Sequence, residues 1–250
     1  MTVDERFHLS GKVAAVIGGA GHLCSTLAAA MRASRMEVVI LDRVKPAPRS
    51  GRPALPALRC DVTSKRDLVR CREIILKRYG RVDVLLNGAG TNAPTPFLKI
   101  SEREIQQILG VNLIGTLYGC QVFGEAMVKQ RAGSIINVAS VSMGPPLSKA
   151  FVYSTAKAGV ANLTQNLARE WAPFHVRVNA LRPGFFPTAW SLRHFIDAER
   201  KAKILSHTPM RRFGRPEELI GAVLWLASDA ASFVTGSVVA VDGGFTAMTI

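Results

Sequence analysis

The 250-residue sequence contains no long hydrophobic run. No stretch approaches the roughly 18 consecutive apolar residues that mark a membrane helix. The first ten residues include Asp4, Glu5 and Arg6 where a secretion signal has an apolar segment. We therefore expect no membrane span, no secretion and a cytoplasmic location.

Cysteines are few and unpaired in the sequence. The four thiols form no CxxC motif and have no histidine at metal-ligand spacing; they are Cys24, Cys60, Cys71 and Cys120. This pattern indicates neither a metal site nor a redox pair. Buried free thiols are expected instead.

Acidic residues are scarce relative to basic ones. The chain has 18 Asp and Glu against 32 Lys and Arg, a net charge of +14. Such a charge suits nucleic acid, an anionic substrate or a basic solvated surface. The basic residues are spread along the chain, with small clusters at 43–59 and 200–215, and no stripe interleaves them with aromatics. We expect no nucleic-acid partner and a small-molecule substrate, with an anionic one as a candidate.

Short apolar runs alternate with helical patterns from start to finish. The runs predict strands at 13–17, 38–41, 57–60, 82–86, 134–138, 176–181 and 238–241, of which 57–60 is the weakest. Helical spacing covers residues near 21–34, 64–79, 101–130, 151–173 and 216–229. This alternation predicts a doubly wound, Rossmann-type α/β fold of about seven parallel strands with helices on both faces. Because no linker is visible, we expect residues 1–250 to form one domain.

Two stretches interrupt the alternation. Four prolines within residues 45–56 predict a loop. Residues 185–215 follow a strand directly, at the carboxyl edge where α/β proteins bind ligands. We expect this second stretch to form a substrate lid containing a short helix.

A glycine-rich turn follows the first predicted strand. Gly18, Gly21, His22 and Leu23 lie where that strand ends and the next helix begins, so that backbone N–H groups there can bind a phosphate. Asp42 ends the second strand, where a carboxylate accepts hydrogen bonds from ribose hydroxyls and repels a 2′-phosphate. This predicts NAD as cofactor. Arg43 can neutralise a phosphate, so NADP stays an alternative.

Tyr153 and Lys157 lie one helical turn apart on one face of a predicted helix, about 6 Å along the axis. A tyrosine with a pKa near 10 is a poor base at neutral pH, and a neighbouring ammonium favours its phenolate. The pair is therefore a candidate for acid/base catalysis on an alcohol or carbonyl.

Further motifs accompany this pair in order, and together they resemble the classical short-chain dehydrogenase/reductase family over about 9–245. The matching segments are the Gly18 turn, Asp61-Val62, Asn87-Gly88-Ala89-Gly90, Asn112, Ser140, Tyr153 with Lys157, Arg177-Val178-Asn179, Pro183-Gly184 with Thr188, and Asp242-Gly243-Gly244. The resemblance implies an NAD(P)-dependent oxidoreductase acting on CH–OH groups, in a homotetramer or homodimer.

The resemblance also implies roles for single residues. Tyr153 would be the acid/base, Ser140 would hydrogen-bond the substrate oxygen, and Lys157 would lower the tyrosine pKa and bind the nicotinamide ribose. Asn112 would hold a proton-relay water. The remaining cofactor contacts would be Asp61 and Val62 at the adenine, Asn87, Gly88 and Ala89 at the adenosine, and Pro183, Gly184, Phe186 and Thr188 near the nicotinamide.

One departure concerns the glycine turn, where His22 and Cys24 stand in place of the family's second and third glycines. A side chain at position 22 narrows the approach to the pyrophosphate unless it points away. We expect Gly21 to take over the strained conformation.

The substrate is less defined. The turn, the Pro183-Gly184-Phe185-Phe186 segment and residues 208–218 look like the sugar-acid branch of the family, which includes fructuronate (mannonate) oxidoreductase-like and gluconate 5-dehydrogenase-like members. Candidate substrate contacts are Ser142, Lys149, Trp190 and Arg193, of which the two cations would suit a carboxylate. Aromatic residues in the lid fit instead a 3-oxoacyl thioester or a bulky apolar ketone. A catalytically silent NAD-binding regulator is a further alternative.

Overall fold

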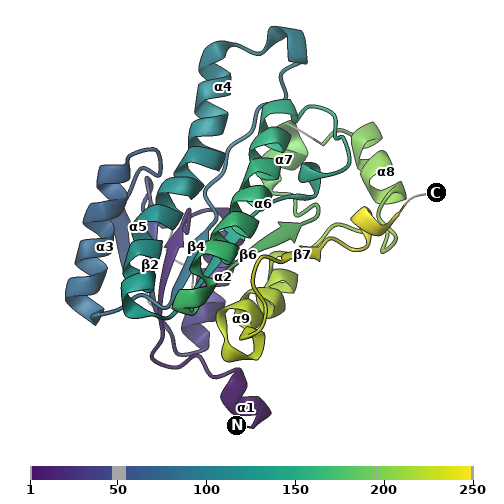
Figure 1. Ribbon diagram of the computed structural model, residues 1–250. Helices are drawn as coiled ribbons and strands as arrows, with labels where there is room; N and C mark the ends of the chain where they lie inside the picture. Colours follow the sequence, from purple (N-terminus) through teal and green to yellow (C-terminus); the bar gives the residue numbers. More distant parts are fainter. Residues whose placement is uncertain (1, 47–54, 195, 249–250) are drawn as a thin grey trace.

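Seven parallel strands form one sheet in the computed structural model. The structure describes residues 2–46, 55–194 and 196–248, except for the side chains of residues 189, 190 and 194. The strands are β1 (Val13–Ile17), β2 (Glu37–Asp42), β3 (Ala57–Arg59), β4 (Val84–Asn87), β5 (Gly133–Val138), β6 (Val176–Pro183) and β7 (Val238–Val241). Their order is β3-β2-β1-β4-β5-β6-β7, and every neighbouring pair is parallel. The predicted doubly wound α/β fold is confirmed (Figure 1).

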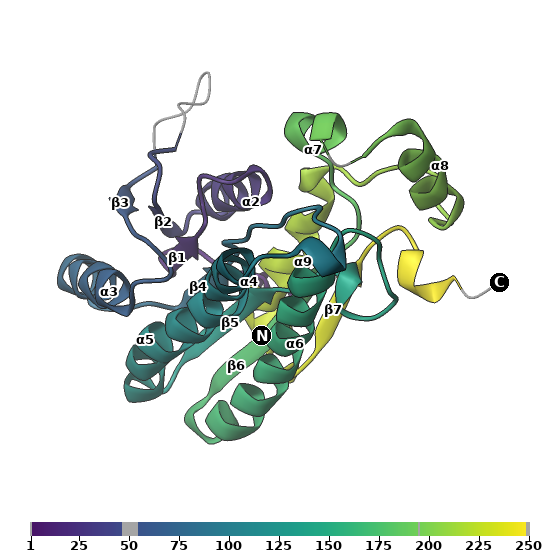
Figure 2. The same ribbon diagram turned by 90° about the horizontal axis from the view of Figure 1, so that it is seen from above.

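Helices cover both faces of the sheet (Figure 2). One face packs on α3 (Lys65–Tyr79), α5 (Gly115–Gln130) and α6 (Phe151–Trp171). The other packs on α2 (His22–Ala33) and α9 (Ile220–Ala227). Apolar residues fill both interfaces, and the central strands β1 and β4 are wholly buried. Burial on both sides explains why β1 consists of apolar residues throughout and why β4 is apolar up to its last residue, Asn87.

The remaining helices are short. They are α1 (Val3–Arg6), α4 (Glu102–Leu109), α7 (Ala189–His194) and α8 (Ala198–Ser206), with single turns at Phe97–Lys99, Val141–Met143, Ala172–Phe174, Asp229–Ala231 and Phe245–Ala247. Both α7 and α8 lie within residues 185–215, where one short helix was predicted. Most of the predicted loop 45–56 lies outside the described residues.

Two predicted helices differ in detail. The expected helix 101–130 is interrupted by a π-helical segment, Gly110–Ile114, between α4 and α5. The expected helix 216–229 starts as a 3₁₀ turn, Pro216–Leu219, and its α-helical part, Ile220–Ala227, ends two residues earlier than expected. Apolar periodicity does not distinguish these helix types.

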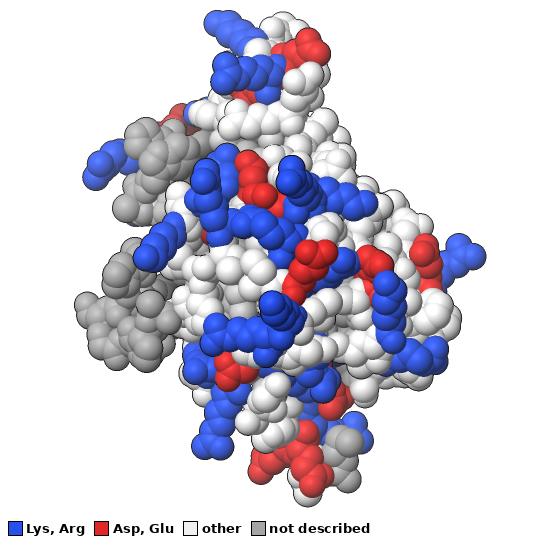
Figure 3. All heavy atoms as spheres, turned by 90° about the vertical axis from the view of Figure 1, so that its left-hand side faces the viewer, with Lys and Arg blue, Asp and Glu red and all other residues white. Residues whose placement is uncertain are grey.

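Basic side chains are spread over the face seen from the left of Figure 1, with acidic side chains between them (Figure 3). Within the described ranges no helix combines the length and apolarity needed to cross a membrane. The same residues contain no group of three or more His, Cys, Asp or Glu side chains able to hold a metal ion.

Candidate active site

Two adjoining cavities lie at the carboxyl ends of the central strands. The first, of about 460 Å³, is lined by Ser140, Tyr153 and Lys157 and is here named the α6 cavity. The second, of about 800 Å³, is lined by Asp42 and Asp61 and is named the β2 cavity. Both are bordered by Gly18, Gly21, Gly88, Gly90 and Thr91. They meet beyond the carboxyl ends of β1 and β4, the neighbouring strands at which the strand order changes direction, and open α/β sheets bind ligands at this position.

The glycine turn joins the two cavities. Gly18 has φ +75°, and a Cβ at this position would lie 2.6 Å from the Ala89 backbone nitrogen, so only glycine fits. Gly21 has φ −70° and precedes the first residue of α2. The expectation that Gly21 takes the strained conformation is therefore wrong, because Gly18 has it. Among the described residues no side chain caps the start of α2, which lies where the two cavities meet, so its first N–H groups are available to a ligand there.

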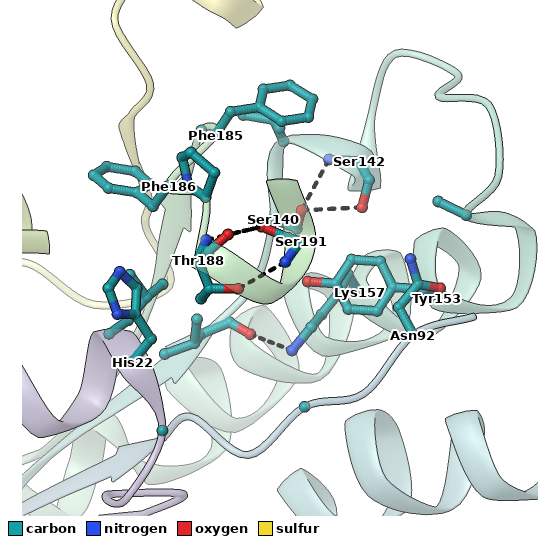
Figure 4. Close-up of a pocket in the computed structure, with 18 of the residues that line it drawn as sticks. His22, Asn92, Ser140, Ser142, Tyr153, Lys157, Phe185, Phe186, Thr188 and Ser191 are labelled. Atoms are coloured by element: carbon teal, nitrogen blue, oxygen red, sulfur yellow. Dashed lines mark hydrogen bonds between the residues drawn. The ribbon is translucent and has the colours of Figure 1, made fainter. Parts of the chain in front are cut away.

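His22 and Cys24 occupy different environments on the first turn of α2. His22 is exposed and borders the α6 cavity (Figure 4). Cys24 is buried, and a Cβ at position 88 would overlap its sulfur. The cysteine therefore fills the space that the absent side chain of Gly88 leaves. Burial raises the pKa of the Cys24 thiol to about 12, which keeps it neutral and unreactive.

Two carboxylates border the β2 cavity. Asp42 accepts hydrogen bonds from the Ala20 nitrogen at 3.0 Å and the Val44 nitrogen at 3.1 Å. Asp61 accepts from the Thr63 nitrogen and hydroxyl at 2.9 and 2.7 Å. Burial acts to raise the pKa of Asp61, but these bonds hold it below its usual value. The cavity therefore has fixed acceptors, which suit ribose hydroxyls.

Ser140, Tyr153 and Lys157 lie together in the α6 cavity (Figure 4). Ser140 follows β5, and α6 presents Tyr153 and Lys157 with the ammonium 5.6 Å from the phenol ring centre. The Lys157 ammonium donates to the Val138 carbonyl at 2.7 Å, and burial lowers its pKa to about 8. Burial raises the pKa of Tyr153, and a hydrogen bond with Ser140 opposes that shift.

Ser142 orients the Ser140 hydroxyl. Its backbone nitrogen and its hydroxyl both donate to the Ser140 Oγ, at 3.2 and 3.0 Å. A hydroxyl oxygen has two lone pairs, and these bonds occupy both, so the O–H of Ser140 is the donor that remains for Tyr153 or for a substrate oxygen.

Asn112 is fully buried in the π-helical segment. Its amide donates to the Thr91 and Ile108 carbonyls at 2.7 and 2.9 Å, and its oxygen accepts from the Thr91 nitrogen at 3.3 Å. These bonds fix the loop at Gly90 and Thr91, which borders both cavities.

Most of the predicted site residues line a cavity. The predicted residues that line the α6 cavity are Gly18, Gly21, His22, Leu23, Gly88, Ser140, Ser142, Tyr153, Lys157, Gly184, Phe186 and Thr188. The predicted residues that line the β2 cavity are Asp42, Arg43, Asp61, Val62 and Ala89, together with the glycines that border both cavities.

Several predicted residues line neither cavity. Asn87 points into the core, where its amide donates to Asn137 at 2.8 Å, and Pro183 is buried at the end of β6. Lys149 lies 3.8 Å from Asp197, and Arg193 is exposed. The side chain of Trp190 is outside the described residues.

Sequence reasoning missed other lining residues of the α6 cavity, including Asn92, Ser191 and Arg200. Ser191 exchanges hydrogen bonds with Thr188 at the start of α7. That Thr-x-x-Ser spacing is a capping pattern, and it was the available signal. The sequence around Arg200 gave no such signal beyond its place in a basic cluster.

Comparison with known proteins agrees with this geometry. A family model described as enoyl-(acyl carrier protein) reductase matches residues 22–246. The uncharacterized oxidoreductase UxuB of Bacillus subtilis is 38% identical over 96% of both chains. The chain belongs to the short-chain dehydrogenase/reductase family. This member is an NAD(P)-dependent oxidoreductase that interconverts an alcohol and a ketone.

Two further relatives of this family member have named substrates or ligands. Galactitol 2-dehydrogenase (L-tagatose-forming) of Cereibacter sphaeroides is 35% identical over 96% of this chain and 97% of its own. The crystal structure of a gluconate 5-dehydrogenase from Burkholderia cenocepacia, in complex with NADP and tartrate, is 29% identical. It covers 99% of this chain and 100% of its own, with a TM-score of 0.93.

The described residues fit a nicotinamide dinucleotide. The two cavities share five lining residues and are together named the groove. The glycine turn lets a ligand approach the backbone closely, and the start of α2, which no described side chain caps, suits a pyrophosphate. Asp42 lies at one end of the groove and Tyr153 at the other.

Proposed function

We propose that the protein interconverts a secondary alcohol and a ketone on a polyol or sugar acid, with NAD as cofactor. The observation that carries the proposal is the lining of the α6 cavity beside Tyr153. Ser142, Thr188, Ser191 and Asn92 all border it. Several hydroxyl and amide groups suit a substrate with many hydroxyls, which a purely apolar cavity would exclude. The resemblance to galactitol and gluconate dehydrogenases supports the same substrate class.

In this proposal Tyr153 is the acid/base. In the oxidation direction the substrate hydroxyl gives its proton to the Tyr153 Oη, and in the reduction direction Tyr153 returns it. Ser140, oriented by Ser142, donates its O–H to the substrate oxygen and stabilises the charge that develops there. The nicotinamide, when bound, supplies the hydride acceptor or donor.

Lys157 and Asn112 support the proton transfer. With a pKa of about 8, Lys157 is mostly protonated at neutral pH, and its ammonium favours the phenolate form of Tyr153. It would also bind the nicotinamide ribose. Asn112 fixes the Gly90–Thr91 loop and would hold the water through which Lys157 exchanges protons with solvent.

The other predicted cofactor residues divide between the two ends of the groove. Asp42, Arg43, Asp61, Val62 and Ala89 would contact the adenosine half. Gly184, Phe186 and Thr188 would contact the nicotinamide half. The Asp42 carboxylate supports NAD over NADP, because it repels a 2′-phosphate.

We also infer that residues 185–215 act as a substrate lid, since Phe185, Ser191 and Arg200 from this stretch border the α6 cavity. The family resemblance supports a homotetramer or homodimer in the cytoplasm. Apolar side chains exposed near α5 and α6, including Ile114 and Phe151, are consistent with such an assembly.

The Tyr153→Phe variant tests the proposal. We expect kcat with a polyol or sugar acid to fall by about 10²- to 10⁴-fold while the Kd for NADH is unchanged, because only the proton donor is removed. Turnover is followed by absorbance at 340 nm (the NADH band) with a panel of hexitols, hexonates and an acetoacetyl thioester.

Tyr79→Phe is the matched control. The Tyr79 hydroxyl is buried without a hydrogen-bond partner among the described residues, so its removal should leave kcat unchanged. An unaltered kcat in Tyr153→Phe would refute the acid/base assignment. NADH binding without turnover of any panel member by the wild type would favour the regulatory alternative.

A further inference from the structure

Arg200 is a cation in the α6 cavity that the proposed reaction does not use. It is the third residue of α8, which begins after Asp197; the Asp197 carboxylate caps the helix by accepting from the Arg200 nitrogen at 2.7 Å. The cap fixes the start of the helix, and the Arg200 side chain reaches the cavity that Ser140 and Tyr153 also border.

The guanidinium group is held at one edge. Its two terminal nitrogens donate to the Ser148 hydroxyl at 2.9 Å and to the Ser148 carbonyl at 2.8 Å. A guanidinium has five N–H donors in a fixed plane, so three remain for other acceptors. Ser148 lies in the segment before α6, whose residues Leu147 and Ala150 also border the cavity. Arg200 is therefore oriented before any ligand binds.

Arg200 forms no ion pair with any carboxylate in the described part of the chain. No described carboxylate lies within 4.0 Å of its guanidinium, and Asp197 lies beside Lys149 instead, at 3.8 Å. None of the described residues that line the α6 cavity is acidic. Burial lowers the pKa of Arg200, with Asp197 opposing the shift, but an arginine stays protonated at neutral pH. A partly buried cation that forms no ion pair with a described carboxylate favours an anionic ligand.

We propose that Arg200 binds the carboxylate of a sugar-acid substrate and so selects sugar acids over neutral polyols. This inference rests on the proposed function, since it assumes that the substrate occupies the α6 cavity. A planar guanidinium binds a carboxylate through two parallel hydrogen bonds, which a hydroxyl cannot match. Lys149 and Arg193, the cations expected from the sequence, do not border the cavity.

Binding of a matched pair of six-carbon ligands tests the inference without requiring turnover. The Kd values of D-gluconate and D-glucitol are measured by calorimetry on the full chain with NADH bound, for wild type, Arg200→Gln and Arg200→Lys. Lys201→Gln removes a neighbouring exposed cation from α8 and is the charge control. Ser148→Ala removes one tether of the guanidinium but keeps its charge.

We expect Arg200→Gln to weaken gluconate binding by about 10- to 100-fold, with glucitol and NADH binding unchanged. Arg200→Lys should weaken gluconate binding less than Arg200→Gln does, and Ser148→Ala should weaken it only slightly. Lys201→Gln should leave gluconate binding unchanged. Equal losses for gluconate and glucitol would overturn the inference, because they would indicate only a structural tie to Ser148. Undiminished gluconate binding in Arg200→Gln, or none in the wild type, would overturn it too.

The same measurements distinguish a failure of the proposed function from a failure of the carboxylate site at Arg200. If the wild type turns over no polyol or sugar acid but binds gluconate through Arg200, the function fails and the carboxylate site stands. If it turns over glucitol but does not bind gluconate, the function stands and the carboxylate site fails.

Discussion

The β2 and α6 cavities are built from different parts of the fold. The ends of β1, β2 and β4 and the residues after β3 provide much of the β2 cavity, and backbone N–H groups hold both Asp42 oxygens. The α6 cavity has one wall from β5, β6 and α6, and another from the loops and short helices of residues 185–200. In the proposed function the strand ends of the sheet would fix the contacts to the adenosine half of the cofactor. The segment after β6 would supply contacts to the nicotinamide half and to the substrate, and it can vary the substrate contacts without disturbing the sheet.

Lys157 tests whether the α6 cavity is organised for chemistry at a cost in stability. Burial lowers its pKa from 10.5 to about 8, so the folded state disfavours the charged form. We expect Lys157→Met to raise the free energy of unfolding at neutral pH by about 1–3 kcal/mol, less than the full shift because the bond to Val138 is lost. Urea denaturation of the ligand-free protein measures this change.

The pH dependence of that gain has a definite sign. Between pH 8 and 10.5 the folded wild type binds fewer protons at Lys157 than the unfolded chain, so its stability rises relative to the variant. The advantage of Lys157→Met should therefore shrink over this range. A difference that stays constant with pH would contradict the assigned pKa.

Gly88 tests the junction between the cavities. Its φ is not positive, but a Cβ would overlap the Cys24 sulfur, so Gly88→Ala should destabilise the protein by about 1–3 kcal/mol through overpacking. Cys24→Ala removes the sulfur that the new Cβ would overlap. Adding Gly88→Ala to the Cys24→Ala variant should therefore lower the free energy of unfolding much less than adding it to the wild type. Thermal unfolding of the four proteins measures this coupling; additive effects would show that the two residues are independent.

Asp42 tests the β2 cavity alone. Asp42→Asn removes the charge that opposes a 2′-phosphate, so kcat/KM with NADP should rise relative to NAD on the order of tenfold. The KM of the alcohol substrate should not change. Asp4→Asn, in α1, makes the same charge change far from the site and should leave the ratio alone. A wild-type preference for NADP would reverse our interpretation of Asp42.

The Ser142→Ala variant changes the α6 cavity alone, and its expected effect on kcat is the smallest of those predicted. Ser142→Ala removes one of the two bonds to the Ser140 Oγ, so kcat should fall by about 3- to 10-fold. NADH binding should be unaffected. Ser34→Ala, which loses a hydroxyl bonded to Ala30, is the control. A loss of NADH affinity instead would mean that the two cavities are not separable.

The sequence predicted the sheet and the β2 cavity well for a physical reason. Strands buried on both faces must be continuous apolar runs, and ligand contacts at their carboxyl ends follow from the positions of the strands. All seven strands were predicted within two residues at each end, including Val13–Ile17 and Val238–Val241 without error.

Side-chain direction was harder to predict. Asn87 ends β4 beside the β2 cavity, but its amide turns inward to Asn137, since neighbouring strand positions face opposite sides. Arg200 was missed because several cations follow one another on α8, and only the path of the chain after β6 determines which one faces the cavity. Local spacing carries no information about that path.

The π-helical segment Gly110–Ile114 sets the angular relationship between α4 and α5. A π-helical turn contains one residue more than an α-helical turn. Deleting a single residue there would let the two helices merge into one regular helix and would turn α4 by about 100° about its axis. Arg103 and Gln106 on α4, which border the β2 cavity, would then point elsewhere. The length of this segment is therefore as constrained as its composition, and insertions or deletions should be tolerated less here than in the loops beyond β6.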